Sequence, residues 1–232
     1  MYVSNYYELL CLIQHLHIHT SPYLYPMLRI IKHLLPLFII QFFTWLALFS
    51  LWIYATPVFT RYLFNSTDTE SPAFQNGVIW VGIYFAFYSF LAACLAFGIP
   101  RLLKYITKEL LHAYALLTGA LGLLLIYFIR DRYLMFLSFI FIGIAWSSIS
   151  NLTYRIVGDS APENKEVMYL AVFNFSVVIP QVIAAFFLGY INEHYFQGKT
   201  INIILLGACS MLVAGLLMFF LKPNPPTEAQ GE

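Results

Sequence analysis

Charged residues are scarce in this sequence of 232 residues. Asp, Glu, Lys and Arg together make up 10% of the chain, whereas hydrophobic residues make up 61%. A soluble globular domain carries roughly 25% charged residues, because charge covers its surface. The scarcity therefore excludes an ordinary soluble domain. The net charge of +1 also gives no reason to expect a nucleic-acid partner.

Cysteines and catalytic motifs are equally scarce. Cys11, Cys94 and Cys209 lie far apart and match neither a disulfide framework nor a cysteine-rich metal site. The chain has no phosphate-binding glycine-rich loop, no metal-binding His/Glu helix and no nucleophile elbow. We therefore expect no enzyme activity, no cofactor and no metal.

The sequence does contain long apolar runs. A bilayer core is about 30 Å thick, and about 20 apolar residues of helix cross it. Within lipid every backbone polar group must be paired, which leaves helices or closed barrels, and these runs lack the alternation of barrel strands. The sequence predicts an all-α membrane protein with six transmembrane helices, at residues 36–60, 77–99, 110–129, 133–154, 167–191 and 201–221.

The distribution of Lys and Arg predicts the orientation, because cytoplasmic loops are richer in these residues. With six spans, both termini lie on one side of the membrane. One side carries eight of the twelve Lys and Arg residues and should be cytoplasmic. That side collects Arg29, Lys32, Arg101, Lys104, Lys108, Arg155, Lys165 and Lys222, and the other side collects the remaining four, Arg61, Arg130, Arg132 and Lys199.

Six helices with both ends inside also match three helices followed by three of opposite orientation. That is the inverted repeat that forms one half of a major facilitator transporter. The first three helices share no clear residue-level similarity with the last three, so this expectation rests on topology.

Short motifs in the first and fifth helices, and one basic loop, resemble a known family. The motifs resemble the carboxy-terminal half of a sugar:cation symporter of the major facilitator superfamily. The similar members are of sucrose and maltose type and are related to the glycoside-pentoside-hexuronide symporters. The motifs are QFFTW at 41–45, WIY at 52–54, FNF at 173–175, IPQ at 179–181 with Gly189, and the loop PRLLK at 100–104.

The resemblance implies a sugar substrate, a coupling cation and a lipid bilayer as surroundings. The family has twelve helices, so we expect an amino-terminal half-transporter or a second copy of this chain as partner. The resemblance covers residues 30–221 and leaves an extension at 1–29 and a cytoplasmic tail at 222–232. The extension is interpreted as the replaced start of a truncated gene, or alternatively as a natural amphipathic segment. Its His15, His17 and His19 alternate, and metal binding there is the weaker interpretation because no carboxylate is close.

Gln41 and Trp45 are the first candidate sugar contacts. They share a helix face with Leu48 and Trp52. A glutamine amide can donate to and accept from sugar hydroxyls, and indole faces can pack on the C–H face of a sugar ring. The alternative is a packing face with tryptophans at the membrane interface.

Asn151, Asn174 and Gln181 are the other candidates. Asn151 belongs to a small and polar stripe, for which helix packing is the alternative. Asn174 and Gln181 share a face on either side of Pro180, which should interrupt the helix hydrogen bonds. Transporters use interrupted helices at binding sites, whereas helix–helix association is the alternative.

No Asp, Glu, Lys or Arg falls in the middle of a predicted helix. Proton coupling normally needs such a group, and the resembled family keeps its coupling carboxylates in the amino-terminal half. This argues against proton-coupled transport by the chain alone. A six-helix membrane scaffold or assembly subunit is the alternative function.

Overall fold

The computed structural model describes residues 24–162 and 164–221, and its regular elements in those ranges are helices. They are α2 (Leu24–Tyr62), α3 (Pro72–Ala96), α4 (Ile99–Leu102), α5 (Lys108–Phe128), α6 (Met135–Asp159), α7 (Glu166–Phe173), α8 (Phe175–His194) and α9 (Ile201–Met218). Within this part of the chain, six helical segments are long and apolar enough to cross a membrane, with α7 and α8 forming one of them. The predicted all-α protein with six transmembrane helices is confirmed.

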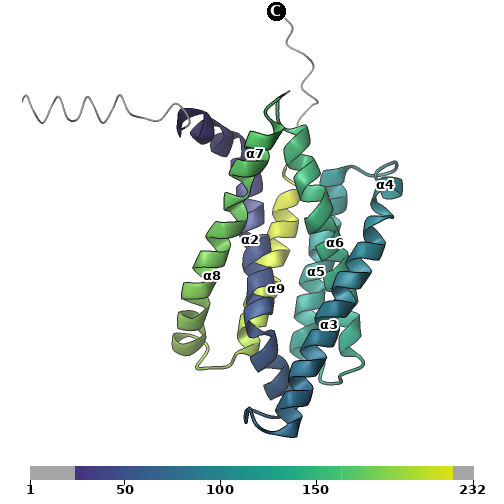
Figure 1. The fold of residues 1–232 in the computed structure, drawn as a ribbon, viewed down its shortest axis with the longest axis vertical. Helices are drawn as coiled ribbons and strands as arrows, with labels where there is room; N and C mark the ends of the chain where they lie inside the picture. The colour runs from purple at the N-terminus through teal and green to yellow at the C-terminus, as the bar shows by residue number, and fades with distance from the viewer. Residues whose placement is uncertain (1–23, 163, 222–232) are drawn as a thin grey trace, which may run out of the picture.

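The first helix begins earlier than the sequence predicted. We expected a start at Pro36, because proline lacks an amide hydrogen and favours the first turn of a helix. Instead α2 begins at Leu24 and contains Pro36 in its interior. Figure 1 shows the first part of α2 at an angle to the rest, as expected where proline removes one hydrogen bond. The predicted boundary at residue 30 thus falls inside α2, while most of the predicted extension and the tail from 222 lie outside the described residues.

The first three spans (α2, α3 and α5) and the last three (α6, α7–α8 and α9) make matching contacts. Helix α5 packs on α6 as α9 packs on α2, and α3 packs on α6 as α7 and α8 pack on α2. Helices α5 and α9 pack on each other. Since consecutive spans alternate in direction, the two sets of three helices run in opposite orientations. Figure 1 shows α8 and α3 as flanks on either side of the central helices.

Glycines lie at both central crossings and allow close approach. A Cβ at Gly122 of α5 would lie 2.7 Å from the Ser138 carbonyl oxygen of α6. A Cβ at Gly207 of α9 would lie 3.2 Å from the Ala47 carbonyl oxygen of α2 and would collide with Ser50 Oγ. In membranes, where the hydrophobic effect does not drive helices together, such close backbone contact is a main source of helix association.

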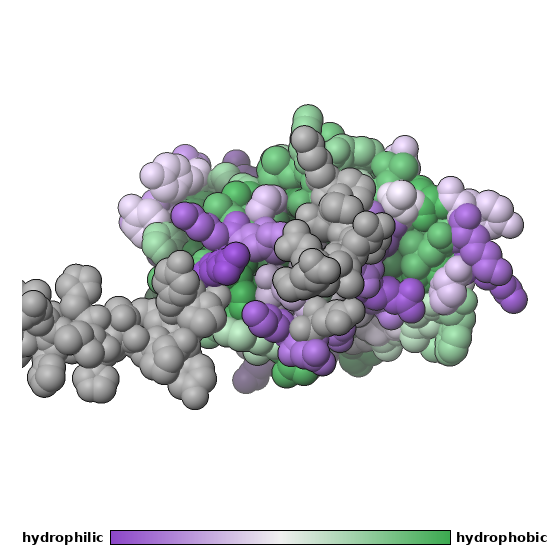
Figure 2. All heavy atoms as spheres, turned by 90° about the horizontal axis from the view of Figure 1, so that it is seen from above, coloured by the Kyte–Doolittle hydropathy of each residue, from purple (hydrophilic) through white to green (hydrophobic). Residues whose placement is uncertain are grey.

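The two ends of the bundle carry the basic residues. One end, called here the Lys108 end, also carries Arg29, Arg101 and Arg155; the Arg132 end carries Arg61, Arg130 and Lys199. Figure 2 looks onto the Lys108 end and shows hydrophilic side chains gathered there, with hydrophobic surface toward the rim. This distribution is the one expected of a bundle whose middle lies in hydrocarbon and whose ends meet water.

Candidate functional site

Three partly buried tryptophans of α2 and α6 meet one another. Trp45 and Trp52 of α2 lie 6.2 Å and 5.6 Å, between ring centroids, from Trp146 of α6. Phe49 packs beside Trp45 and Trp52, with ring centroids 5.7 Å and 5.4 Å away. We call Trp45, Phe49, Trp52 and Trp146 the aromatic cluster. The rings occupy the space between α2 and α6, the two helices that correspond in the repeated contact pattern.

The polar atoms around the aromatic cluster are only partly paired. Trp52 Nε1 donates to Tyr88 Oη of α3 at 3.1 Å. Trp45 Nε1 is buried, and no hydrogen-bond partner for it exists among the described residues. The same holds for Oε1 of Gln41, one turn away on α2, whose residue is 1% exposed. A buried polar atom without a partner is costly, so water or a polar ligand is needed to complete these two groups.

Gln41 and Trp45 therefore stand together, on α2, as the sequence predicted for a shared helix face. The structure does not contain a ligand, so their contact with sugar stays a prediction. Sequence reasoning missed Trp146 of the cluster and Tyr88, its hydrogen-bonded neighbour. Each is one of several aromatic residues in an apolar helix, and nothing in the sequence says which of them face α2.

Asn151 is not brought to the aromatic cluster. Its side-chain amide donates to the Ser147 carbonyl oxygen of its own helix at 2.8 Å. Gly143, in the same predicted stripe, faces α3, where an added Cβ would lie 3.1 Å from Leu91 Cδ2. Trp146 precedes Asn151 by five residues, which places the two side chains about 140° apart around α6. The stripe thus meets α3 at Gly143, and a sugar contact by Asn151 stays a prediction.

Asn174 and Gln181 lie on the flank formed by α7 and α8, and both are exposed. The buried side of α8 consists of Ser176, Pro180, Ala184 and Leu188. Helix geometry places Asn174 and Gln181 about 20° apart and beside that buried stripe. The helix is interrupted at Asn174, where α7 ends and α8 begins, whereas Pro180 lies within α8. We predicted an interruption at Pro180, and the structure places it six residues earlier.

A second polar region lies at the Lys108 end. Lys108 of α5 pairs with Asp159 of α6, and its Nζ lies 3.8 Å from Oε1 of the neighbouring Glu109. These residues line a cavity of about 320 Å³ between α2, α5, α6 and the end of α9. Asp159 ends α6 and Glu166 begins α7, so the connection between these spans is shorter than the sequence predicted, and both side chains are exposed.

The described residues contain no group of three His, Cys, Asp or Glu side chains arranged to hold a metal. His15, His17 and His19 lie outside these residues. No protein-family model, curated protein or solved structure matches the chain.

Proposed function

We propose that this multi-pass membrane protein is one six-helix half of a secondary transporter, of the sugar:cation symport class. The observation that carries the proposal is the repeat of helix contacts between α2–α3–α5 and α6–α7/α8–α9 in opposite orientation. Inverted repeats of this kind build many transporter folds, with the substrate site near the midplane, where the repeats meet. The resemblance of residues 30–221 to sugar symporters gives the substrate class.

The aromatic cluster and its unpaired neighbours support a sugar as the substrate. Gln41 Oε1 and Trp45 Nε1 offer one acceptor and one donor to hydroxyl groups. The adjacent indole rings offer faces for the apolar C–H side of a sugar ring. Gln181 and Asn174, exposed on the α8 flank, would add polar contacts from a second helix. These groups together are typical of a carbohydrate site.

One six-helix unit supplies one wall of such a site. The opposite wall would come from an amino-terminal half or from a second copy of this chain. Rocking of the two units about the bound sugar would then expose it alternately to each side. The coupling cation would bind together with the sugar in the closed state.

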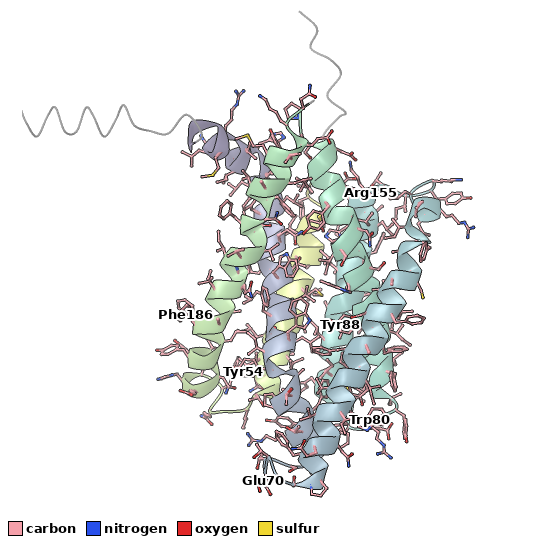
Figure 3. All side chains as sticks on the ribbon, in the orientation of Figure 1. Tyr54, Glu70, Trp80, Tyr88, Arg155 and Phe186 are labelled. Carbon is pink, nitrogen blue, oxygen red and sulfur yellow. The ribbon has the colours of Figure 1, made fainter. Side chains whose placement is uncertain are left out.

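Sugar binding tests the proposal directly. Three of the four tryptophans lie in the aromatic cluster, so a sugar bound there should change the intrinsic fluorescence of the purified chain in lipid nanodiscs. We expect saturable changes with sucrose or maltose and none with mannitol. Trp45→Phe should weaken the affinity, whereas Phe186→Leu on the outer face of α8 should not (Figure 3). Absence of saturable binding and of uptake into liposomes for every sugar tested would contradict the proposal and leave a membrane scaffold.

We also propose that the Lys108 end, with both termini, is cytoplasmic. The support is the eight-to-four bias of Lys and Arg in the sequence. The described residues include seven of the eight and all of the four. In a cysteine-free background, Thr69→Cys should react with an impermeant thiol reagent added outside the cell. Tyr105→Cys, equally exposed but at the Lys108 end, should react only after lysis. The reverse pattern would invert the orientation.

A further inference from the structure

A histidine that sequence reasoning overlooked lies inside the bundle. His112 belongs to α5, one turn in from Lys108, and its side chain is 0% exposed. Its Nδ1 lies 2.7 Å from Ser148 Oγ of α6. Its Nε2 is buried and has no hydrogen-bond partner among the described residues. Nδ1 is therefore hydrogen-bonded, whereas Nε2 has no partner in the described part of the chain.

Such a residue is costly in a membrane protein. Leaving a buried polar atom unpaired costs about 1–3 kcal/mol, which a leucine at this position would avoid. Titratable groups within membrane spans are rare and usually mark ion or proton pathways. Packing alone therefore does not account for His112.

The cavity at the Lys108 end is lined by Glu109, one helical turn from His112. Glu109 precedes His112 by three residues on α5, which places their Cβ atoms about 5–6 Å apart. Glu109 is 7% exposed and lines the cavity of about 320 Å³ at the Lys108 end. Water in that cavity would reach the Glu109 carboxylate, and the carboxylate lies one helical turn from the ring.

The other acidic and basic groups near His112 belong to three helices, α5, α6 and α2. On α5 itself these are Lys108 and Glu109, and α6 contributes Asp159 and the exposed Arg155. His33 of α2 lines the cavity. The α9 sequence contains no acidic or basic residue and only Cys209 as a titratable group. Lys108 Nζ lies within ion-pair distance of both Asp159 and Glu109, and of these two acids Glu109 lies on the same helix as the ring, one turn away.

We propose that His112 is a proton-binding site, loaded from the cavity through Glu109. In the neutral ring Nδ1 carries the hydrogen and donates it to Ser148 Oγ, which leaves Nε2 as the acceptor. A hydronium ion in the cavity protonates the Glu109 carboxylate, and that proton then passes to Nε2 through an intervening water molecule, since no direct hydrogen bond joins the two groups. The products are water, a Glu109 carboxylate and a His112 imidazolium, so charge and atoms balance. Use of this site for coupling rests on the proposed transport function, in which the proton would be the cation.

Ring ¹⁵N NMR of the histidine-labelled full chain in nanodiscs tests the site without requiring transport. His112→Asn identifies the His112 signals by their loss, and His194→Asn, at an exposed histidine on α8, serves as the matched control. We expect the His112 signals to change from neutral to imidazolium as the pH is lowered from about 9 to about 4. In Glu109→Gln the change should need a lower pH than in the wild type, because a nearby carboxylate stabilises the imidazolium. Asp159→Asn should lower the pH of this change by less than Glu109→Gln does.

A His112 ring that stays neutral over that whole range would overturn the proposal. A titration that is identical in wild type and Glu109→Gln would remove Glu109 from the route. Failure of the transport function would look different. In that case His112 would titrate as described, while sugar would change neither the ring signals nor the tryptophan fluorescence.

Discussion

The two sets of three helices share one contact pattern but hold their flanking helices differently. Flank α3 meets α6 through large aromatic rings, with Tyr84 stacked on Phe139 at 4.8 Å between centroids. Flank α8 meets α2 through Ser176, Pro180 and Ala184, with Leu188 as its only large buried side chain. The α3 flank is therefore aromatic, whereas in the other flank the aromatic contacts to α2 are confined to Tyr169 and Phe173 of α7, and α8 contributes mostly small residues.

The two flanks also differ in the side-chain hydrogen bonds that join them to the rest of the bundle. Tyr84 Oη donates to the Arg132 carbonyl oxygen at 2.7 Å, and Tyr88 accepts from Trp52. Among the described residues, the one side-chain hydrogen bond from α8 to another helix goes to the adjoining α7, from Ser176 Oγ to the Phe173 carbonyl oxygen. The α7–α8 span is also interrupted at Asn174. Few buried contacts and few tertiary hydrogen bonds are the features of segments that open at low free-energy cost. In the proposed transporter, we therefore expect α8 to be the mobile flank and α3 the fixed flank.

The largest expected effect is on the fixed flank. Tyr84→Ala should destabilise the protein by about 3–5 kcal/mol, because it removes a fully buried ring. Tyr190→Ala on α8 should cost less than about 1 kcal/mol, since Tyr190 is 52% exposed. Reversible unfolding in bicelles measures both. Equal losses would show that the two flanks are held with equal strength.

The central crossings should respond alike, in contrast to the flanks. Gly122→Ala and Gly207→Ala should each destabilise by about 1–3 kcal/mol, because the added Cβ overpacks a helix contact. Gly82→Ala and Gly189→Ala are matched controls, with no atom within 4 Å of the added Cβ. They should be neutral or stabilising by up to about 1 kcal/mol. A large loss at only one crossing would break the correspondence between α2–α9 and α6–α5.

Much of this arrangement follows from the sequence, because length and apolarity alone determine which segments cross a bilayer. The spans were predicted within a few residues, apart from the start of α2 at Pro36. The contacts between spans were not predictable, since apolar residues face both lipid and neighbouring helices and leave little amphipathic pattern. Trp146 and Tyr88 were missed for that reason. His112 was missed because only Asp, Glu, Lys and Arg were sought inside the spans.

On the mobile flank, Gln181→Leu tests the binding role of α8. If Gln181 bonds a sugar hydroxyl, its loss should cost about 1–3 kcal/mol, or about ten- to hundredfold in apparent affinity. The change should leave stability near wild type, because Gln181 is exposed and is not seen bonded to another helix. Fluorescence titration with sugar and unfolding in bicelles separate the two effects. Unchanged affinity with reduced folded yield would make Gln181 a packing residue.

The smallest expected effect concerns the single hydrogen bond that joins α2 to α3 at the aromatic cluster. Among the described residues, Trp52 Nε1 to Tyr88 Oη is the one side-chain hydrogen bond between these two helices. Trp52→Phe removes the donor and part of the ring area, so its effect alone mixes packing with bonding. Tyr88→Phe removes the acceptor and leaves the ring. The double-mutant cycle isolates the bond, and we expect a coupling free energy of about 0.5–1.5 kcal/mol.

The same cycle, repeated with sugar bound, tests whether α3 is the fixed flank. A hydrogen bond that persists through the cycle of transport should show the same coupling energy in the free and the sugar-bound protein. A coupling energy that falls toward zero on sugar binding would mean that α3 separates from α2 when the site is occupied. In that case the aromatic contacts of α3 would not mark rigidity, and both flanks would move together around the aromatic cluster.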